Sequence, residues 1–463
     1  METQTDPGLK VDLAVIGFGK GGKTLAATLA RQGKRVVMIE QSPAMYGGTC
    51  INIGCVPTKA LVHQAEHQDR HLEADERYAL AAQATSSLTS LLRGKNFAML
   101  DTLDTATVVT GRATFTGPHT LLVTAGEDRL EIEAATIVIN TGAEPTLPPI
   151  PGLAQSAHVV TSTGLLARDA RPRHLVVLGG GYVAVELASL HAQFGVQVTM
   201  LQRSGRLLTA EDTDTAAEVE TLLTEAGARV LTGVTVRSVA DDDGGARVTF
   251  TDAVGREASV VGDVVLAALG RRPVTDGLGL ADVGIDVDGR GGVVVDEHLR
   301  TSLPWVYAVG DANGGPQFTY VSLDDYRIVL DQLTGAGTRS TRDRVAVPHT
   351  VFTSPPLGRV GMTEAAARES GRPVKVAVRR VADMATVPRS RIVGEPRGVM
   401  KAVVDAETDA VLGVAILAYD AHELVNTVAL AMRHGVTASE LRDSIWTHPS
   451  MTEAFNDLFG ALG

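Results

Sequence analysis

Two segments of the chain repeat the same order of hydrophobic and polar positions. In residues 11–40 and again in residues 174–203, a short apolar run ends at a glycine, a helix-length stretch with spaced apolar residues follows, and a second apolar run closes the segment. Strand-length apolar runs on either side of a helical pattern are typical of parallel strands joined by a crossover helix. The pattern therefore predicts two βαβ units, each with a glycine-rich turn after its first strand.

The C-terminal part of the chain has a different pattern. VMKAVVD (residues 399–405) and VLGVAILAY (residues 411–419) are strand-like, and ELVNTVALAMRHG (residues 423–435) has helical spacing. Successive strands followed by a helix indicate an antiparallel sheet covered by helices. We therefore expect an α/β protein with two Rossmann-like domains and a C-terminal α+β domain.

Composition and charge narrow the class of protein. The chain has 463 residues, 44% of them hydrophobic, which fits a globular protein of several domains. A net charge of −12 without a basic run argues against nucleic acid or an anionic membrane as partner. The polar N-terminus METQTDPGLK lacks the apolar stretch of a secretion signal, and no apolar run has the length of a transmembrane helix. We expect a cytoplasmic protein that acts on small molecules.

The first glycine-rich turn has the spacing Gly17-x-Gly19-x-x-Gly22. Glycines at these positions permit a tight turn and let the backbone approach a pyrophosphate at a helix N-terminus. Glu40 follows 23 residues after Gly17, where a carboxylate can accept both hydrogens of a ribose diol. The first unit is therefore predicted to bind a dinucleotide with a plain adenosine ribose.

The second turn differs from the first at its third small residue, and the second unit also lacks an acid at the position that corresponds to Glu40. Its small residues are Gly179, Gly181 and Ala184. The position 23 residues after Gly179 is Gln202, and Arg203 and Arg206 follow it. A neutral glutamine beside arginines admits a 2′-phosphate, which a glutamate would repel. This pattern favours NADPH, and two solvated surface arginines are the alternative interpretation.

Both cysteines of the chain lie in GGTCINIGCVPTK (residues 47–59), as Cys50 and Cys55. Pro57 suits the first turn of a helix, so both thiols are expected near a helix N-terminus, where the dipole favours a thiolate. Lys59 adds positive charge, and a lowered thiol pKa is what disulfide exchange needs. A redox-active cysteine pair between two dinucleotide sites predicts an electron relay.

Two other interpretations of the cysteines remain open. They can be buried and unreactive, because free cysteine is often buried. They can also bind zinc together with His63 and His67, although the spacing C-x4-C-x7-H-x3-H departs from that of structural zinc sites. The corresponding non-enzymatic function is a cysteine-based metal-binding or redox-sensing protein that holds dinucleotides. We expect no metal site.

Several motifs together resemble the class I flavoprotein disulfide reductases, a family that includes glutathione reductase, dihydrolipoamide dehydrogenase and mercuric reductase. Besides GGTCINIGCVPTK, these motifs are INTGAEPTLPPIPG (residues 139–152), GGGYVAVE (179–186), ALGRRP (268–273), VYAVGD (306–311) and THPSMTE (447–453). They follow the order of the family over nearly the whole chain. The resemblance implies a glutathione reductase-like fold with FAD and NADPH as cofactors, NADH being possible.

The resemblance also implies a division into domains and an assembly. The expected segments are an FAD-binding domain (residues 1–150), an NAD(P)H-binding domain (151–272), a return to the FAD/central domain (273–341) and a dimerisation domain (342–463). In this family the C-terminal domain joins two copies of the chain, which implies a homodimer.

The resemblance assigns roles to individual residues. Cys50 is the expected interchange thiol and Cys55 the expected charge-transfer thiol, and Lys59 and Glu186 are the expected ion pair beside the flavin. Tyr182 resembles an aromatic gate over the nicotinamide pocket. Further cofactor contacts are implied for Thr49, Glu40, Ala113, Asp311 and Gly270.

The pair His448 and Glu453 resembles the acid–base dyad of this family, which the partner subunit supplies. His448 can take or give the proton of Cys50, and Glu453 can fix the tautomer of the imidazole and stabilise its charged form. A histidine five residues before a glutamate carries little information alone, but the cysteine pair and both glycine-rich turns give it a context.

Within the family, the sequence is most similar to the bacterial reactive-chlorine-resistance (RclA-type) flavoproteins. The similarity rests on GFGKGGKTLA, EQSPAMYGGTCINIGC, QFTYVSLDDYRIV, RVGMTE and the stretch from HPSMTE to NDLF. It implies electron flow from NADPH through FAD to the Cys50–Cys55 disulfide and on to a small electrophile such as hypothiocyanous acid, or to a metal ion. Dihydrolipoamide dehydrogenase, a glutathione-type disulfide reductase and mercuric reductase are the alternative enzymes.

Overall fold

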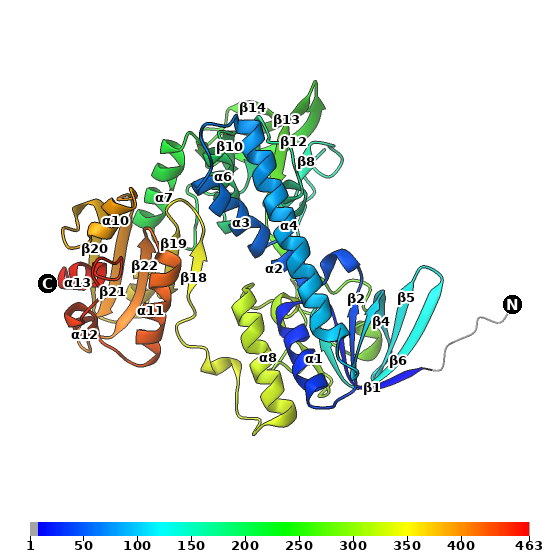
Figure 1. Cartoon of the computed structure of the whole chain (residues 1–463). Coiled ribbons are helices and arrows are strands. Elements are labelled where there is room, and N and C mark those ends of the chain that lie inside the picture. Colours follow the sequence, from blue (N-terminus) through cyan, green and yellow to red (C-terminus); the bar gives the residue numbers. More distant parts are fainter. Residues whose placement is uncertain (1–7, 463) are drawn as a thin grey trace.

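The first predicted unit forms a mainly parallel sheet in the computed structural model, which describes residues 8–462 (Figure 1). Its elements are β1 (Leu9–Ile16), α1 (Lys20–Arg31), β2 (Val36–Glu40), η1 (Pro43–Met45), α2 (Gly48–Asn52), α3 (Cys55–Glu66), α4 (Ala74–Asp101), β3 (Ala106–Thr110), β4 (Arg112–Gly117), β5 (Thr120–Ala125) and β6 (Asp128–Ile139). The strand order is β3-β2-β1-β6-β5-β4. Ile16 lies opposite both Ile39 and Ile139, so β1, β2 and β6 end at one edge and bring their following residues together there.

The second predicted unit forms a parallel sheet of order β11-β10-β9-β15-β8, with an antiparallel sheet β12-β13-β14 beside it. Its elements are β8 (Val159–Val160), α5 (Ser162–Leu166), β9 (His174–Leu178), α6 (Tyr182–Gln193), β10 (Gln197–Gln202), α7 (Thr213–Glu225), β11 (Arg229–Thr232), β12 (Thr235–Asp242), β13 (Gly245–Thr251), β14 (Glu257–Gly262) and β15 (Val264–Ala267). Leu178 lies opposite Leu201 and Ala267, so the second glycine-rich turn emerges at the matching edge.

Two chain crossings join the first and second units. They are β7 (Ala143–Pro145) and β16 (Arg271–Pro273), which pair with each other antiparallel. The returning chain forms η2 (Ala281–Val283), β17 (Val306–Ala308), η3 (Gly310–Asn313), α8 (Thr319–Thr334) and η4 (Thr341–Asp343). β17 pairs with β6 and α8 packs on α1, so this segment completes the first unit. We propose domain boundaries at residues 150, 272 and 341. The two chain crossings and the packing of the returning segment on the first unit support them.

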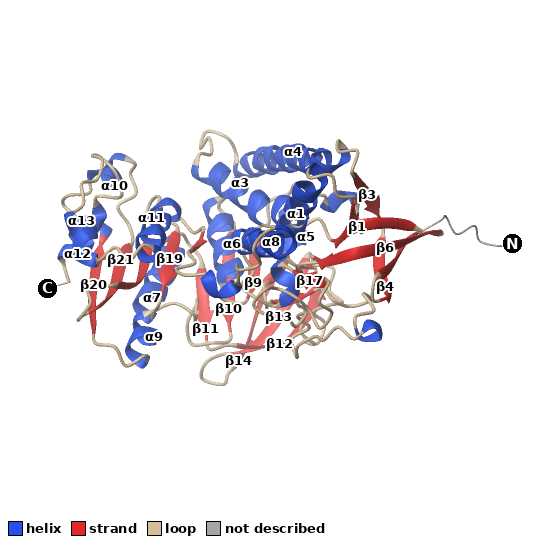
Figure 2. Cartoon of the chain, turned by 90° about the horizontal axis from the view of Figure 1, so that it is seen from below, coloured by secondary structure: helices blue, strands red, loops and turns tan. Residues whose placement is uncertain are grey.

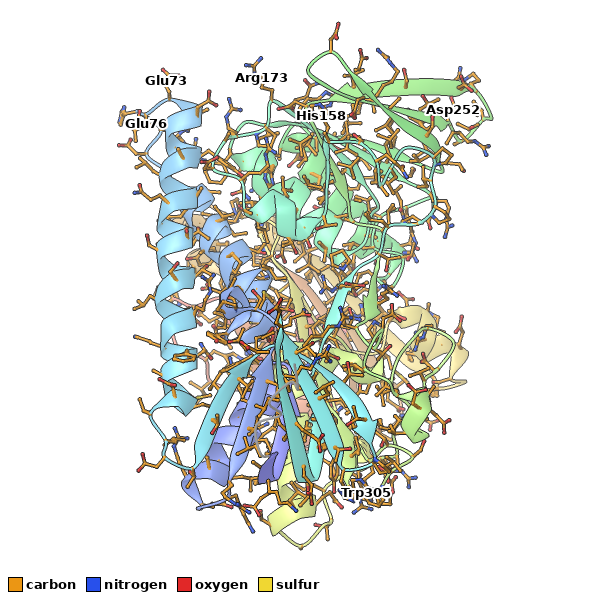
Figure 3. The ribbon with its side chains drawn as sticks, turned by 90° about the vertical axis from the view of Figure 1, so that its right-hand side faces the viewer. Glu73, Glu76, His158, Arg173, Asp252 and Trp305 are labelled. Carbon is orange, nitrogen blue, oxygen red and sulfur yellow. The ribbon has the colours of Figure 1, made fainter. Side chains whose placement is uncertain are left out.

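The long helix α4 connects the two units along one side of the molecule. Its N-terminal end, marked by Glu73 and Glu76, lies level with the second unit, whereas Trp305 marks the opposite end of the first unit (Figure 3). Tyr78 of α4 is 1% exposed and its ring lies 5.2 Å from that of Phe194, which follows α6. Burial of this aromatic pair holds the two units against each other.

The C-terminal part forms an antiparallel sheet of order β18-β19-β22-β21-β20 with helices against it (Figure 2). Its elements are β18 (His349–Val351), β19 (Leu357–Gly361), α9 (Glu364–Glu369), β20 (Val374–Arg380), η5 (Val381–Asp383), α10 (Pro388–Ile392), β21 (Val399–Asp405), β22 (Val411–Leu417), α11 (Ala421–Arg433), α12 (Ala438–Asp443) and α13 (Ala454–Gly460). The sheet also shares a core with α7, where Leu357 and Leu417 pack in one cluster with Leu222.

The structure confirms the predicted fold class and the strands and helix expected in the C-terminal part. The two Rossmann-like sheets and the α+β unit are present as the hydrophobic pattern indicated. Within residues 8–462, no helix combines the length and the apolar character that crossing a bilayer requires.

Candidate active site

One cavity of about 1290 Å³ is lined by residues of all three units. Of the predicted site residues, those in its lining are Gly17, Gly19, Glu40, Thr49, Cys50, Cys55, Lys59, Tyr182, Glu186 and Asp311. The other predicted residues, all within the described part of the chain, lie outside this lining: Gly22, Ala113, Gly179, Gly181, Ala184, Arg203, Arg206, Gly270, His448 and Glu453. The structure thus brings the first glycine-rich turn, the cysteine pair and the start of α6 together.

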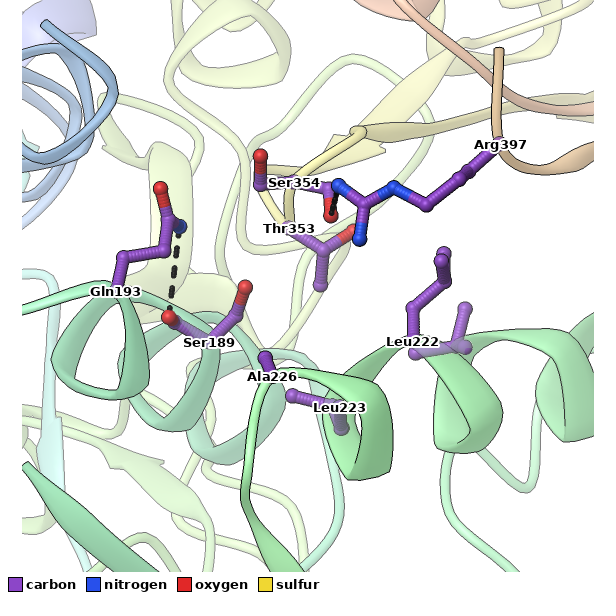
Figure 4. Close-up of a pocket in the computed structure, with 9 residues that line it drawn as sticks. Ser189, Gln193, Leu222, Leu223, Ala226, Thr353, Ser354 and Arg397 are labelled. Carbon is purple, nitrogen blue, oxygen red and sulfur yellow. Dashed lines mark hydrogen bonds between the residues drawn. The ribbon is translucent and has the colours of Figure 1, made fainter. Parts of the chain in front are cut away.

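A second, much smaller cavity of about 80 Å³ lies between α6, α7 and the C-terminal unit (Figure 4). Gln193 donates to the carbonyl of Ser189 at 3.4 Å, and Arg397 donates to the carbonyl of Ser354 at 3.4 Å. None of the predicted site residues contributes to its lining within residues 8–462.

The first glycine-rich turn fits the phosphates of a dinucleotide. Gly17 has a φ of +97°, and a Cβ added there would lie 2.4 Å from the carbonyl oxygen of Asn140. Glu40 is 7% exposed, and its carboxylate accepts from the backbone N–H of Phe18 at 3.0 Å and of Ser42 at 3.3 Å. Burial raises the pKa of the Glu40 carboxyl, and these N–H groups oppose the rise. A buried acid at the strand end suits a ribose diol.

The second glycine-rich turn keeps only part of this geometry. Gly179 has a φ of +117°, and an added Cβ would lie 2.4 Å from the carbonyl oxygen of Ala268. A Cβ at Gly181 would meet no atom within 4 Å, so this position leaves open space for a ligand. Ala184 is fully buried, which shows that the helix–sheet contact here accommodates a methyl group.

The predicted 2′-phosphate residues lie in the loop after β10. Gln202 accepts from the backbone N–H of Arg203 at 3.1 Å and donates to the carbonyl of Arg206 at 3.3 Å. The guanidinium of Arg206 donates to the carbonyls of Glu211 at 2.8 Å and Thr209 at 2.9 Å. Arg206 therefore shapes this loop, whereas the exposed Arg203 keeps its side chain available for an anion.

The cysteine pair lies at the junction of two short helices. Cys50 lies in α2, and Cys55 is the first residue of α3, as the helix N-terminus prediction required. The Cys55 sulfur lies 3.6 Å from the hydroxyl oxygen of Thr319. A hydrogen bond from the Cys50 thiol lowers the pKa of Cys55 to about 6, with Thr319 and Lys59 adding to the effect against the opposing burial. The same hydrogen bond raises the pKa of Cys50, and burial adds to that rise.

An ion pair beside the cysteines connects the first and second units. Lys59 Nζ lies 2.5 Å from Glu186 Oε1, and Glu186 Oε2 accepts from the backbone N–H of Phe352 at 2.9 Å. The same ammonium lies 4.6 Å from the centre of the Phe352 ring. This geometry places a fixed cation and a fixed carboxylate on the wall of the cavity near Cys55.

The remaining predicted flavin contacts lie on the first unit. Asp311 follows β17 in η3, and burial raises the pKa of its carboxyl while the charge of Arg271 opposes the rise. Ala113 is 3% exposed within β4, so only its backbone can reach a cofactor. Gly270 has a φ of +125° at the second chain crossing.

The predicted dyad is formed within the C-terminal unit. Glu453 Oε1 lies 2.8 Å from His448 Nδ1, and Glu453 Oε2 accepts from the backbone N–H of Ser450 at 2.9 Å. The side chain of His448 is 68% exposed. The histidine is thus oriented by its carboxylate and faces outward from its own chain.

Several residues beside the motifs were not predicted. Asn140 donates to the Gly17 carbonyl at 2.9 Å, Thr319 contacts Cys55, and Arg271 lines the cavity. Asn140 follows β6, Arg271 begins β16 and Thr319 begins α8, and each lies within a motif quoted above. Counting which residues end the parallel strands would have found Asn140. His63 and His67 stack on each other with ring centres 4.2 Å apart, and no metal-binding cluster of three or more ligand residues occurs in residues 8–462.

Two family models match the chain. The model described as "Pyridine nucleotide-disulphide oxidoreductase" matches residues 11–325, and the model of that family's dimerisation domain matches residues 347–459. The "Probable pyridine nucleotide-disulfide oxidoreductase RclA" of Escherichia coli (strain K12) is 46% identical over 454 residues, which cover 98% of this chain and 99% of that protein. The mercuric reductase of Streptomyces lividans is 36% identical over 458 residues, which cover 96% and 94%.

Among solved structures, the Cu(II) complex of the HOCl-induced flavoprotein disulfide reductase RclA from Escherichia coli matches with a TM-score of 0.93. The two chains are 46% identical, and the match covers 98% of this chain and 100% of the other.

The chain belongs to the pyridine nucleotide-disulphide oxidoreductase family. It is a homologue of Escherichia coli RclA and a flavoprotein disulfide reductase of class I, which uses FAD and a pyridine nucleotide and carries the family's dimerisation domain. The predicted family, enzyme class and cofactors are confirmed, and the non-enzymatic alternative is wrong.

Proposed function

We propose that this enzyme is a cytoplasmic homodimer that uses NADPH to reduce a small electrophilic acceptor, with hypothiocyanous acid as the first candidate. The observation that carries the proposal is the cavity whose lining combines Cys50, Cys55 and the Lys59–Glu186 pair with the first glycine-rich turn and with Tyr182, the residue that follows the second turn. The similarity to an HOCl-induced reductase supports an acceptor that arises from reactive chlorine chemistry.

NADPH is proposed as the electron donor because the second unit has Gln202 at the position that corresponds to Glu40 in the first unit. Arg203 is exposed at the same strand end, where its guanidinium can pair with a 2′-phosphate. The residues proposed to hold FAD are Gly17, Gly19, Gly22, Glu40, Thr49, Ala113 and Asp311. When bound, FAD supplies two-electron transfer between NADPH and the cysteine disulfide.

The cysteines are proposed to carry the reaction with the acceptor. The Cys50 sulfur, once deprotonated, attacks the sulfur of hypothiocyanous acid, and the S–O bond breaks to release water after protonation. The Cys55 thiolate then attacks the Cys50 sulfur, which forms the disulfide and releases thiocyanate. The dithiol loses two electrons and two protons, one of which enters the water molecule. A Cys55 pKa of about 6 keeps the resolving thiolate present at neutral pH.

His448 is proposed to exchange the proton of Cys50 in the partner subunit, with Glu453 fixing the imidazole. The outward-facing position of His448 supports this arrangement, because the dyad does not line the cavity of its own chain. General acid–base catalysis of this kind typically contributes a factor of about 10²–10⁴.

The test is steady-state oxidation of NADPH and NADH by the purified protein with several acceptors. The acceptors are hypothiocyanous acid, cupric ion, mercuric ion, glutathione disulfide and lipoamide, and Cys50→Ser is measured in parallel. Turnover with hypothiocyanous acid that the substitution abolishes would support the proposal. Faster turnover with glutathione disulfide or lipoamide would keep the cysteine chemistry and reject the proposed acceptor.

Cupric ion is the second candidate acceptor, because the matching Escherichia coli structure was solved as a Cu(II) complex. Reduction of cupric ion consumes one electron per ion, so two ions would be reduced per NADPH. That stoichiometry distinguishes it from the two-electron reduction of hypothiocyanous acid.

A further inference from the structure

Lys23 of α1 is a buried lysine that directly follows the first glycine-rich turn. It is 4% exposed, and its ammonium donates to the carbonyl of Gly47 at 3.0 Å and to Asn96 Oδ1 at 2.5 Å. Both acceptors are uncharged, and Lys23 forms no ion pair with a carboxylate in residues 8–462. Buried ammonium groups are ordinarily paired with an anion. The charge of Lys23 therefore remains available to an anion that forms nearby.

The Gly47 carbonyl belongs to the turn that begins α2, the helix that carries Cys50. Gly47 has a φ of +101° and Gly48 a φ of +77°. A Cβ added to Gly48 would lie 2.8 Å from the backbone of the first glycine-rich turn, and one added to Gly47 would lie 3.2 Å from Asn96 Cγ. The turn before Cys50 is thus packed between α1 and α4, where the Lys23 ammonium holds its carbonyl.

The helix α4 offers Lys23 an amide oxygen and no carboxylate. Asn96 Nδ2 donates to the carbonyl of Leu92 at 2.7 Å, which directs the Oδ1 atom toward Lys23. Arg93, the charged residue one turn earlier on α4, donates from Nε to Asn52 Oδ1 at 2.8 Å. The contacts from α4 therefore orient the ammonium without neutralising it.

The charge of Lys23 acts on Cys50. Cys50 is three residues after Gly47, and residues three apart lie on one face of a helix. Burial lowers the pKa of Lys23 to about 8 and the charge of Lys20 adds to the fall, whereas the charge of Cys50 opposes it. A hydrogen bond with Thr319 of α8 and the charge of Lys23 in turn oppose the rise in the pKa of Cys50. With a pKa of about 8, Lys23 is charged at neutral pH.

The two thiols are influenced by different lysines. The Cys55 thiol raises the pKa of Cys50, and Lys23 is the cation that opposes this rise. The charges of Lys59 and Glu186 act on Cys55, in opposite directions. Lys23 therefore has the same relation to the attacking thiol that Lys59 has to the resolving thiol.

We propose that Lys23 is a positioning residue for Cys50, whose buried ammonium holds the Gly47 carbonyl and favours the thiolate form of Cys50 that attacks the acceptor. This proposal rests on the proposed role of Cys50 as the attacking thiol. A nearby opposite charge favours an ionised thiol, so the loss of Lys23 should raise the pH at which Cys50 ionises by about one pH unit.

Alkylation of Cys50 by iodoacetamide in the flavin-loaded homodimer tests the proposal, because it needs neither coenzyme nor acceptor. In a Cys55→Ser background, Cys50 is the only cysteine of the chain, and the alkylation rate as a function of pH gives the midpoint of its ionisation. Lys23→Met should raise this midpoint by about one pH unit. Lys95→Met removes an exposed lysine of α4, and as the matched control it should leave the midpoint unchanged.

Asn96→Asp separates the charge of Lys23 from its hydrogen bond to the turn. The substitution places a carboxylate against the ammonium at nearly constant volume and retains the contact between Lys23 and Gly47. Because the new carboxylate cancels the charge of Lys23, the midpoint should rise as it does in Lys23→Met. If Lys23→Met does not fold or does not retain its flavin, Asn96→Asp decides the question by itself.

A lower alkylation rate with an unchanged midpoint would overturn the proposal, because Lys23 would then only hold the turn. An unchanged midpoint in Asn96→Asp would also overturn it. Loss of flavin from Lys23→Met together with that result would assign the ammonium to the cofactor instead. A failure of the proposed acceptor would leave these midpoints unaffected, whereas a Cys50 that iodoacetamide does not alkylate at any pH would contradict the proposed attacking thiol itself.

Discussion

The two dinucleotide turns share a topology but differ in what their residues contact. In the first turn, an added Cβ at Gly19 would lie 2.8 Å from Asn140, and one at Gly22 would lie 2.6 Å from Val15. In the second turn, Gly181 faces open space and Ala184 is already buried without conflict. The first turn therefore needs its glycines for packing within the protein, whereas the second needs Gly181 only for its ligand.

The strand ends that follow the two turns differ in the same way. Glu40 is buried and bonded to two backbone N–H groups of its own unit. Gln202 bonds to its own loop and leaves the neighbouring Arg203 exposed. A closed, internally bonded site suits a cofactor that stays bound, and an open, charged site suits a coenzyme that exchanges in every turnover.

Gly22→Ala is expected to have the largest effect on stability. Its methyl group would overlap Val15 and the Asn140 amide, which already donates to Gly17. Overpacking of this kind costs about 1–3 kcal/mol, and the displaced turn should also lower the flavin content of the purified protein. Chemical denaturation and the flavin absorbance per chain measure both effects.

Gly181→Ala is the matched substitution in the second turn. It should leave the unfolding free energy and the flavin content unchanged and weaken only NADP⁺ binding. An equal loss of stability in both variants would show that the two turns do not differ as described.

Arg203→Glu is expected to change the coenzyme preference. Losing one charge-assisted hydrogen bond costs about 1.5–3 kcal/mol, so the ratio of kcat/KM for NADPH to that for NADH should fall about 10- to 100-fold. Arg206→Gln serves as the comparison, because that guanidinium is bound to the Thr209 and Glu211 carbonyls. A larger change in preference from Arg206→Gln would reverse the assignment between the two arginines.

Cys55 should titrate well below an ordinary thiol, because Cys50, Thr319 and Lys59 all favour its thiolate. In the two-electron-reduced enzyme, the charge-transfer absorbance between the Cys55 thiolate and the flavin should be present above pH 6. It should be lost as the pH falls through about 6, because the thiolate is then protonated. Spectra recorded between pH 5 and pH 9 locate the midpoint.

The two units contribute to this midpoint with opposite signs. Lys59→Met removes a cation of the first unit and should move the midpoint up, whereas Glu186→Gln removes an anion of the second unit and should move it down. A midpoint near 8.5 in the unmodified enzyme would contradict the predicted stabilisation.

Ala184→Gly is expected to have the smallest effect. The substitution restores the third glycine of the motif in the interior of α6, where glycine costs about 1 kcal/mol relative to alanine. NADP⁺ affinity should stay unchanged, because the side chain of Ala184 is fully buried. A gain in coenzyme affinity would indicate that the alanine methyl group limits ligand binding, contrary to the packing seen here.

Local sequence determined much of this protein. The hydrophobic runs and glycine spacings predicted both βαβ units, since parallel strands and phosphate-binding turns depend on residues within about 30 positions of each other. The cysteine stretch predicted thiols at helix N-termini, and both Cys50 and Cys55 lie there. The motifs also identified the family and its cofactors, which the comparisons confirm.

Tertiary structure alone decided how these parts work together. The Lys59–Glu186 pair, the Thr319 contact with Cys55 and the Tyr182 contact with His349 join residues separated by more than a hundred positions. Packing likewise decides that Arg203 and His448 are exposed and that the Arg206 guanidinium donates hydrogen bonds to backbone carbonyls. Hydrogen-bond partners and burial are set by which chain segments meet in space, and a local pattern does not record those contacts.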